Sequence, residues 1–274
     1  MNRTVLATGC SSGIGRATAE VFLDEEWTVY ATARDTDDIA DLDEKGAVVA
    51  ELDVTDEKQC KTVVNEAVAE TGRLDVLVNN AGYGQHGPLE DLRTKHLHEQ
   101  FDVNVYGPHR LTRAALPHMR EAEEGTIINV SSVAGRVAVP GMGAYSGSKF
   151  ALEGMSDALR NEVSGFGVDV VLVEPGPVET EFRNRVGEEL KKYDRTEAYE
   201  NLYEMQEDAG LLSGQSSPFA STAEEVAEVI LEAGVSPDPK PRYVVGGFAQ
   251  AVLYTRLLPA TIRDKLFGLF RTIS

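Results

Sequence analysis

The chain predicts an α/β fold in which a parallel sheet carries helices on both faces. Short apolar runs rich in β-branched residues alternate with longer segments of helical period from the start of the chain. The connections are short, which is the rhythm of repeated βαβ units. A length of 274 residues is enough for one sizeable core, and we find no internal repeat or low-complexity linker. We therefore expect a single domain over residues 1–274.

The expected elements follow one another in the order strand, helix, strand. Strands are expected at residues 4–8, 27–32, 47–52, 74–79, 125–131, 168–174 and 242–246. Helical period appears at residues 13–25, 56–71, 96–123, 144–165 and 223–234.

Composition excludes several classes of protein. The formal net charge of −19 disfavours nucleic acid or an anionic membrane as partner, because polyanions repel an acidic surface. No apolar run approaches the roughly 20 residues that cross a bilayer, and the N-terminus lacks a secretory signal pattern, so we expect a cytoplasmic protein. Cys10 and Cys60 are too few for a disulfide framework, and neither they nor the five histidines show metal-ligand spacing. The dispersed acidic residues suggest a salt-tolerant, halophilic protein.

A glycine-rich turn joins the first strand to the first helix. Residues 8–15 read Thr-Gly-Cys-Ser-Ser-Gly-Ile-Gly. Glycine permits positive φ and lets the backbone approach a phosphate closely, and the N-terminus of the following helix offers unpaired N–H groups to an anion. A tight turn without a ligand is the plainer interpretation, but the strand–turn–helix context favours nucleotide binding and a Rossmann-type, doubly wound sheet.

The end of the second strand bears on which dinucleotide binds. An acidic residue there would bind the ribose 2′-hydroxyl of NAD, whereas this chain has Ala33 followed by Arg34. A guanidinium suits the 2′-phosphate of NADP. Asp35 or Asp37 could instead neutralise Arg34, so NADP(H) is expected and NAD(H) stays possible.

Tyr145 and Lys149 carry the predicted chemistry. Their spacing of four residues places both side chains on one face of a helix. A phenol has an unperturbed pKa of about 10, and a neighbouring ammonium would lower it toward the range useful for acid–base catalysis. Ser131 or Ser132, at the end of an apolar run, could hold a carbonyl oxygen beside the phenol.

These motifs together resemble the short-chain dehydrogenase/reductase family over about residues 4–182. Thr-Gly-x-x-x-Gly-x-Gly, Asn79-Asn-Ala-Gly82 and Tyr145-x-x-x-Lys149 occur in the family's order and spacing. The resemblance selects Ser132 over Ser131 and implies a catalytic set of Asn104, Ser132, Tyr145 and Lys149. It also implies cofactor contacts by Tyr145, Lys149 and the following residues: Gly9, Ser11, Gly13, Ile14, Gly15, Arg34, Asp53, Val54, Asn80, Ala81, Gly82, Pro175, Gly176, Val178 and Thr180.

The implied reaction is hydride transfer between nicotinamide and a carbonyl or alcohol carbon. Tyr145 would give or take the proton, Ser132 would hold the oxygen, Lys149 would lower the tyrosine pKa and bind the nicotinamide ribose, and Asn104 would support a proton-carrying water chain. Phrases such as Val29-Tyr-Ala-Thr-Ala-Arg34 resemble the hydroxysteroid and retinol dehydrogenase branch, which suggests a lipophilic small-molecule substrate. A non-catalytic NADP(H)-binding regulator is the rival class, although it would have no need of all four catalytic residues.

The second half of the chain holds the parts that set substrate and assembly. Residues 183–218 are where family members build a substrate lid, and His86 is a further candidate to border the substrate. The lid's apolar residues could line a pocket or form the buried face of a short helix: Tyr193, Tyr199, Leu202, Tyr203, Met205, Leu211 and Leu212. An apolar C-terminal extension, residues 246–274, could cover the substrate entrance, join a subunit interface or lie on a membrane surface. Pro259 and the overall acidity weaken the membrane case, so we expect it to pack within the protein or an oligomer. The resemblance implies a homodimer or homotetramer formed through the helices near 96–123 and 144–165.

Overall fold

A seven-stranded parallel sheet forms the centre of the molecule in the computed structural model, which describes residues 3–179, 194–204, 206 and 220–265. The strand order is β3-β2-β1-β4-β5-β6-β7, and every neighbouring pair is parallel. The strands are β1 (Thr4–Thr8), β2 (Thr28–Ala33), β3 (Val48–Glu51), β4 (Val76–Asn79), β5 (Gly125–Val130), β6 (Val168–Pro175) and β7 (Arg242–Val245). This is the doubly wound Rossmann-type sheet that the sequence predicts, with each expected strand found within about two residues of its bounds.

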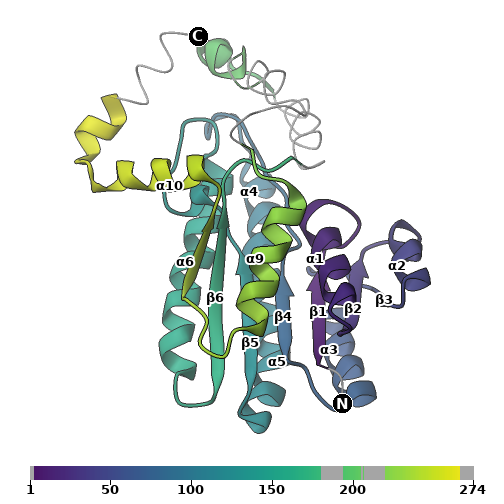
Figure 1. Ribbon diagram of the computed structural model, residues 1–274. Coiled ribbons are helices and arrows are strands. Elements are labelled where there is room, and N and C mark those ends of the chain that lie inside the picture. The colour runs from purple at the N-terminus through teal and green to yellow at the C-terminus, as the bar shows by residue number, and fades with distance from the viewer. Residues whose placement is uncertain (1–2, 180–193, 205, 207–219, 266–274) are drawn as a thin grey trace.

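Helices cover both faces of the sheet (Figure 1). One face is covered by α1 (Gly13–Asp24) and α9 (Ala223–Val235), and the other by α3 (Glu57–Thr71), α5 (Gly107–Ala122) and α6 (Gly143–Val163). The short α2 (Ala40–Glu44) lies near β3 at the sheet's edge (Figure 1).

Two apolar cores separate the sheet from these helical layers. Successive side chains of a strand point to opposite faces. Val5 of β1 therefore packs with Phe22 of α1 in one core, while its neighbour Leu6 packs with Val64 of α3 and Leu111 of α5 in the other. All five of these side chains are fully or almost fully buried. Strands buried on both faces explain why the sequence shows continuous apolar runs.

The helix expected at residues 96–123 has three parts. It consists of α4 (Thr94–Phe101), a π-helical segment (Asp102–Tyr106) and α5. A π-helical turn accommodates an extra residue while the backbone stays helical, so the apolar period survives but the direction of each side chain changes. Asn104 lies inside this segment and is 1% exposed.

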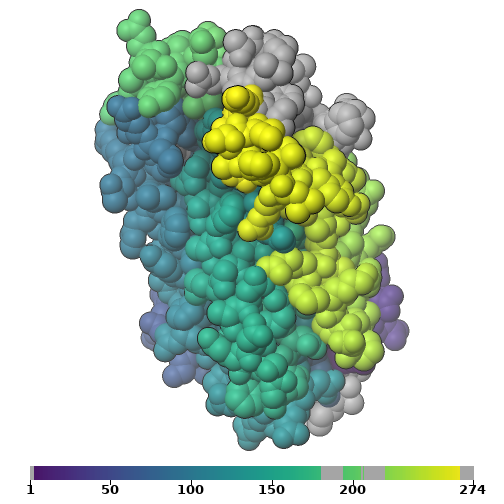
Figure 2. Space-filling model, turned by 90° about the vertical axis from the view of Figure 1, so that its left-hand side faces the viewer, coloured from purple at the N-terminus to yellow at the C-terminus, as the bar shows by residue number. Residues whose placement is uncertain are grey.

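The C-terminal part forms the expected helical extension as far as the structure describes it. After β7, α10 (Gly247–Tyr254) packs through the fully buried Ala249, whose methyl group lies over Gly176. The opposite side of this extension is open, since Tyr254 and Leu257 are 70% and 82% exposed. Figure 2 shows the extension, in yellow, as a ridge across the surface of the molecule above α6. Residues 266–274 lie outside the described part.

The described residues of the expected lid contact the loop that follows β4. Tyr203 is fully buried and packs with Leu92 and Tyr199, which favours the buried face of a short helix over the lining of an open pocket for these two tyrosines. Tyr193, Met205, Leu211 and Leu212 lie outside the described residues. Within the described part, none of the helices is long and apolar enough to cross a membrane.

Candidate active site

The carboxyl ends of the strands gather the predicted site residues at one edge of the sheet. β1 and β4 are neighbours although they are not consecutive in sequence, so connections leave this point in opposite directions and open a crevice at the strand ends. The glycine-rich loop follows β1, Asn80 follows β4 and Ser132 follows β5. Pro175 is the last residue of β6.

The loop after β1 is shaped for close approach of a ligand to backbone. Gly9 and Gly13 have φ values of 73° and 56°, a region that favours glycine. A Cβ at Gly15 would lie 2.3 Å from the carbonyl oxygen of Gly9 and 2.4 Å from Nδ2 of Asn80. Ser12 is the N-cap of α1, yet its side chain caps no backbone N–H. The first turn of α1 therefore keeps N–H groups that can bind an anion such as a pyrophosphate.

Asn80 and Thr8 hold the loops after β4 and β1 together. Asn80 Nδ2 donates to the carbonyl oxygen of Thr8 at 2.8 Å, and Thr8 Oγ1 accepts from the backbone N–H groups of Asn80 and Ala81 at 3.0 and 2.9 Å. The sequence analysis identified Asn80 and Ala81 as site residues, but it did not predict that Thr8 holds the two loops together. The only sequence feature that pointed to Thr8 was its place as the first residue of the glycine-rich motif.

The amide of Asn104 ties three parts of the site together. Its Oδ1 accepts from the Tyr83 N–H at 3.1 Å, and its Nδ2 donates to the Tyr83 carbonyl oxygen at 2.9 Å and to Ser148 Oγ at 3.1 Å. Ser148 Oγ in turn donates to the carbonyl oxygen of Tyr145 at 2.7 Å. Gly82 leaves room for the Asn104 amide beside Tyr83, because a Cβ at Gly82 would lie 3.1 Å from Asn104 Oδ1. The sequence analysis did not identify Ser148 as the link.

Ser132, Tyr145 and Lys149 come together between β5 and α6. The Ser132 hydroxyl is a hydrogen-bond partner of the Tyr145 phenol. Lys149 Nζ lies 5.8 Å from the centroid of the Tyr145 ring and donates to the carbonyl oxygen of Val130 at 2.8 Å. Ser131 points elsewhere, since its hydroxyl faces Glu153. The structure thus brings together the three residues that the resemblance selects.

Burial dominates the protonation of this group. It raises the pKa of Tyr145 to about 12, with the Ser132 hydrogen bond acting in the opposite direction. Burial also lowers the pKa of Lys149 to about 8, and the charge of Glu153 opposes this change. The net direction for Tyr145 is upward, whereas the sequence argument expected the ammonium to lower it, because loss of water around the buried phenol outweighs the favourable contacts.

The segment after β6 borders the same crevice. The Ser132 hydroxyl donates to the carbonyl oxygen of Pro175 at 3.4 Å, and Gly176 N–H donates to the carbonyl oxygen of Val245 at 3.1 Å. Val178 forms an isolated parallel bridge with Ser221. Thr180 lies outside the described residues.

The residues expected near the adenosine half of the cofactor lie after β2 and β3. Val54 is 6% exposed and packs against Gly107, and Asp53 Oδ1 accepts from the N–H and hydroxyl of Thr55. Arg34 is exposed and forms no ion pair with any residue that the structure describes. Asp35 is not its partner, because the Asp35 carboxylate caps the following 3₁₀ turn by accepting from the Asp37 N–H.

His86 lies beside the catalytic candidates. Its ring centroid is 6.3 Å from that of Tyr145. No group of three or more His, Cys, Asp or Glu side chains among the described residues is arranged to hold a metal ion.

Comparison with known proteins places this site in a family context. The model of the short chain dehydrogenase family matches residues 3–191. The chain is 35% identical to the uncharacterized oxidoreductase YbbO of Escherichia coli K12, over 97% of this chain and 94% of YbbO. It is 34% identical to the NADPH-dependent 3-dehydrocapnine reductase of Ornithobacterium rhinotracheale, over 97% of this chain and 96% of that protein.

Solved structures agree in fold. A short-chain dehydrogenase from Streptomyces avermitilis superposes with a TM-score of 0.82 at 33% identity, covering 99% of this chain and 97% of that one. A short-chain dehydrogenase/reductase from Burkholderia phymatum in complex with NAD superposes with a TM-score of 0.79 at 26% identity, covering 94% and 92% of the two chains.

Proposed function

The chain belongs to the short-chain dehydrogenase/reductase family of oxidoreductases that act on CH–OH and C=O groups, and we propose that it uses NADP(H) with a lipophilic ketone or secondary alcohol. The observation that carries the proposal is the meeting of Ser132, Tyr145 and Lys149 at the carboxyl edge of the sheet, beside a glycine-rich loop. A protein that only binds the cofactor would have no chemical need for these three side chains together.

In the proposed reaction each residue has one task. The nicotinamide cofactor, when bound, supplies or accepts the hydride. Tyr145 donates its phenolic proton to the substrate oxygen in reduction and takes it back in oxidation. Ser132 holds that oxygen by a hydrogen bond. Lys149 has two N–H donors beyond the bond to Val130, and we assign these to the nicotinamide ribose and to stabilising the phenolate that forms on Tyr145.

The residues present fit a dinucleotide. The uncapped first turn of α1 suits a pyrophosphate, because its backbone N–H groups can bind an anion. Asn80, Ala81 and Gly82 follow β4 on the other side of the crevice. We assign the adenine to the region of Asp53 and Val54, and the nicotinamide to the region of Pro175, Gly176 and Val178.

The guanidinium of Arg34, which forms no ion pair with the residues that the structure describes, supports NADP(H) over NAD(H). It lies after β2 in the place where the ribose 2′-position is read, and neither Asp35 nor another described acidic residue pairs with it. Charge-assisted hydrogen bonds to a phosphate contribute about 1.5–3 kcal/mol each. We expect Arg34→Ala to lower kcat/KM with NADPH by about 10- to 100-fold and to change that with NADH little.

The control for this test is Arg113→Ala, which removes an exposed guanidinium of α5 that pairs with Glu57. It should leave both cofactors unaffected. A retained NADPH preference in Arg34→Ala would show that another group reads the 2′-position.

The surroundings of Tyr145 support an apolar substrate. Leu89 is 63% exposed, and its side chain lies against Gly143, two residues before Tyr145. A Cβ at Gly143 would lie 2.8 Å from Leu89 Cγ. The centroid of the His86 ring lies 6.3 Å from that of the Tyr145 ring. An exposed aliphatic group at the start of the helix that carries Tyr145 favours a substrate with apolar surface.

The decisive experiment follows cofactor oxidation with NADPH and NADH against a panel of ketones, aldehydes, steroids and retinoids, at low and high salt. Tyr145→Phe should bind cofactor almost as wild type and lose about 10²- to 10⁴-fold in turnover, the usual contribution of an acid–base group. Tyr254→Phe, which changes a 70% exposed tyrosine of α10, is the matched control and should turn over normally. Normal turnover by Tyr145→Phe would refute the mechanism, and tight cofactor binding without turnover of any substrate would favour a regulator.

A further inference from the structure

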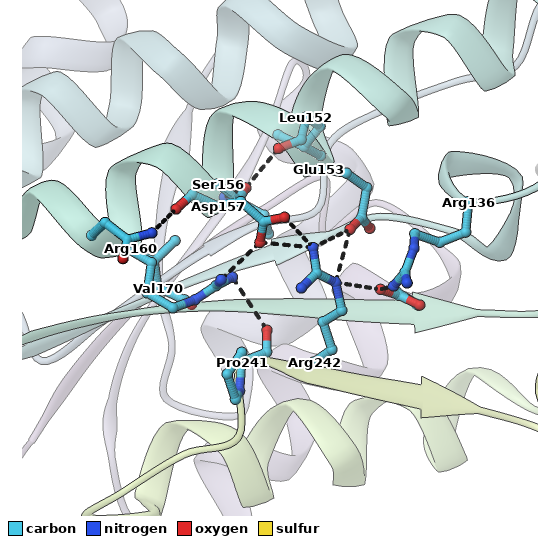
Figure 3. A network of polar contacts seen from close by, with 12 residues as sticks. Arg136, Leu152, Glu153, Ser156, Asp157, Arg160, Val170, Pro241 and Arg242 are labelled. Carbon is cyan, nitrogen blue, oxygen red and sulfur yellow. Dashed lines mark hydrogen bonds and ion pairs between the residues drawn. The ribbon is translucent and has the colours of Figure 1, made fainter. Parts of the chain in front are cut away.

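A buried cluster of charged side chains lies beneath the active site, between α6 and the last two strands. Figure 3 shows Arg242 of β7 reaching between Glu153 and Asp157 of α6, with Arg136 on the far side of Glu153. Arg242 Nη2 donates to Glu153 Oε2 at 3.1 Å and to Asp157 Oδ2 at 2.6 Å. Nothing in the hydride-transfer mechanism above uses this cluster.

Two of its carboxylates are removed from water. Glu153 is 5% exposed, and Glu174 of β6 is fully buried. Glu174 Oε1 pairs with Arg136 Nη1 at 2.7 Å and with Arg242 Nε at 3.0 Å. Burying an unpaired charge is very costly, and the two guanidinium groups offset that cost by pairing with these carboxylates.

Glu153 lies one helical turn after Lys149, on the same face of α6. The two side chains and Ser131 meet over Gly135. A Cβ at Gly135 would lie 2.9 Å from Ser131 Oγ and 3.1 Å from both Glu153 Cγ and Lys149 Cβ. Glu153 and Lys149 are both described, and no ion pair within 4.0 Å joins them, so any influence of one on the other acts through space.

The charged groups around Glu153 come from every element packed against it. They are Lys149 and Asp157 on α6, Glu174 on β6, Arg242 on β7 and Arg136 after the 3₁₀ turn Val133–Gly135. Burial raises the pKa of Glu153, and the charge of Glu174 acts in the same direction. The hydrogen bond from Ser131 and the charge and hydrogen bonds of Arg242 oppose this rise without cancelling it. For Lys149, burial favours the neutral amine, and Glu153 is the charge that favours the ammonium.

We propose that Glu153, held as a carboxylate by Arg242, is a positioning residue that keeps the buried Lys149 side chain in its charged, active form. The inference rests on the proposed function for its catalytic consequence, because only a charged Lys149 can stabilise a phenolate on Tyr145. The coupling between the two side chains is a property of the chain alone.

Glu153→Gln tests the coupling directly. Glutamine keeps the shape of the side chain and can still accept a hydrogen bond from Arg242, but it removes the charge. Lys149 is titrated by NMR with ¹³Cε-labelled lysine, and its signal is identified by its loss in Lys149→Met. We expect the Lys149 midpoint to fall by about one pH unit in Glu153→Gln, as for other groups that lose a nearby opposite charge.

The same change should appear in the reaction. The alkaline fall of kcat/KM should move to lower pH by the same amount, giving about a tenfold loss of activity above the wild-type midpoint. The titration uses neither cofactor nor substrate. It can therefore contradict the Glu153–Lys149 coupling while the Tyr145→Phe test supports the proposed function, and it can support the coupling while that test contradicts the function.

Asp157→Asn is the matched control. Asp157 also forms an ion pair with Arg242, but it lies one helical turn further from Lys149 along α6. Asp157→Asn should therefore leave the titration midpoint of Lys149 unchanged. An equal shift in both variants would overturn the proposal, because the effect would then follow from disturbing Arg242. If Glu153→Gln fails to fold, Glu153→Met takes its place, because it also removes the charge and leaves Arg242 paired with Asp157 and Glu174. An unchanged Lys149 midpoint in a folded variant lacking Glu153 would also overturn it.

Discussion

Gly15 shows how closely the loops of the cofactor crevice are packed. Two groups from separate loops, the Gly9 carbonyl oxygen and Asn80 Nδ2, occupy the position of its missing side chain, at 2.3 and 2.4 Å. Both belong to backbone or to a hydrogen-bonded amide, so neither can move aside without disturbing the link between the loops after β1 and β4.

We expect Gly15→Ala to lower the free energy of unfolding by about 1–3 kcal/mol, the usual result of forcing an extra methyl group into a packed site. Cofactor affinity should fall as well, because the displaced atoms shape the anion site. Gly154→Ala in α6 is the control, since that exposed position has open space around it and alanine there should stabilise the helix by about 0.5–1 kcal/mol. Thermal unfolding of both variants measures this, and a stable Gly15→Ala would show that the loops can separate freely.

The two neighbouring serines show which part of the site a sequence can predict. Ser131 and Ser132 both follow β5, and both meet side chains of α6, so the alternation of side chains along a strand does not choose between them. The residues alone left both open, because the choice depends on where α6 packs against the sheet, which is a long-range contact. The resemblance selected Ser132, and the structure places Ser132 at the phenol and Ser131 at Glu153.

At the scale of elements, strands were predictable because their apolar runs are continuous and their turns are marked by glycine and proline. The π-helical segment Asp102–Tyr106 was not, because its period differs too little from that of an α-helix over five residues. That small difference turns Asn104 toward Tyr83 and Ser148. The resemblance was enough to place Asn104 in the site, but its contacts with Tyr83 and Ser148 could be found only from the structure.

Asp91, in the loop after β4, accepts three of the hydrogen bonds that join this loop to residues 194–204. Asp91 accepts hydrogen bonds from the N–H and hydroxyl of Thr196, at 3.1 and 2.5 Å, and from the hydroxyl of Tyr203 at 2.6 Å. Burial alone would raise the pKa of Asp91, but these hydrogen bonds together hold it below the ordinary value of 3.8.

A carboxyl whose folded pKa is lowered contributes stability above its unfolded pKa, and that contribution is lost as pH falls through the folded value. We therefore expect Asp91→Asn to speed amide hydrogen exchange in residues 194–204 at neutral pH. We expect the wild-type segment to lose its extra protection as the pH falls below the ordinary Asp value and through the lowered pKa of Asp91. The measurement is the rate of amide hydrogen exchange in residues 194–204 as a function of pH, corrected for the intrinsic pH dependence of exchange. Glu90→Gln, which changes an exposed partner of Tyr199, should have a smaller effect; equal effects would mean that Asp91 is no special anchor.

At the scale of the whole molecule, the net charge of −19 is an unfavourable term for a compact state. Some of this repulsion is concentrated. Asp24, Glu25 and Glu26 are consecutive and exposed at the C-terminal end of α1, where the helix dipole already favours positive charge. Salt largely screens interactions between exposed charges that lie more than about 10 Å apart at 0.1 M ionic strength, and more than about 3 Å apart at 1 M.

We expect the free energy of unfolding to rise from low to molar KCl, steeply at first and then more slowly, because screening weakens repulsion between surface carboxylates while the buried pairs of Arg242 are screened much less. The variant Asp24→Asn, Glu25→Gln, Glu26→Gln should be more stable than wild type at low salt and should gain less as salt is added, since part of the repulsion is already gone. Denaturation by urea, which adds no ions, measures both. A wild-type free energy of unfolding that stays flat or falls with KCl would contradict a halophilic surface. If the variant responds to salt as the wild type does, the repulsion that salt relieves must lie elsewhere on the molecule.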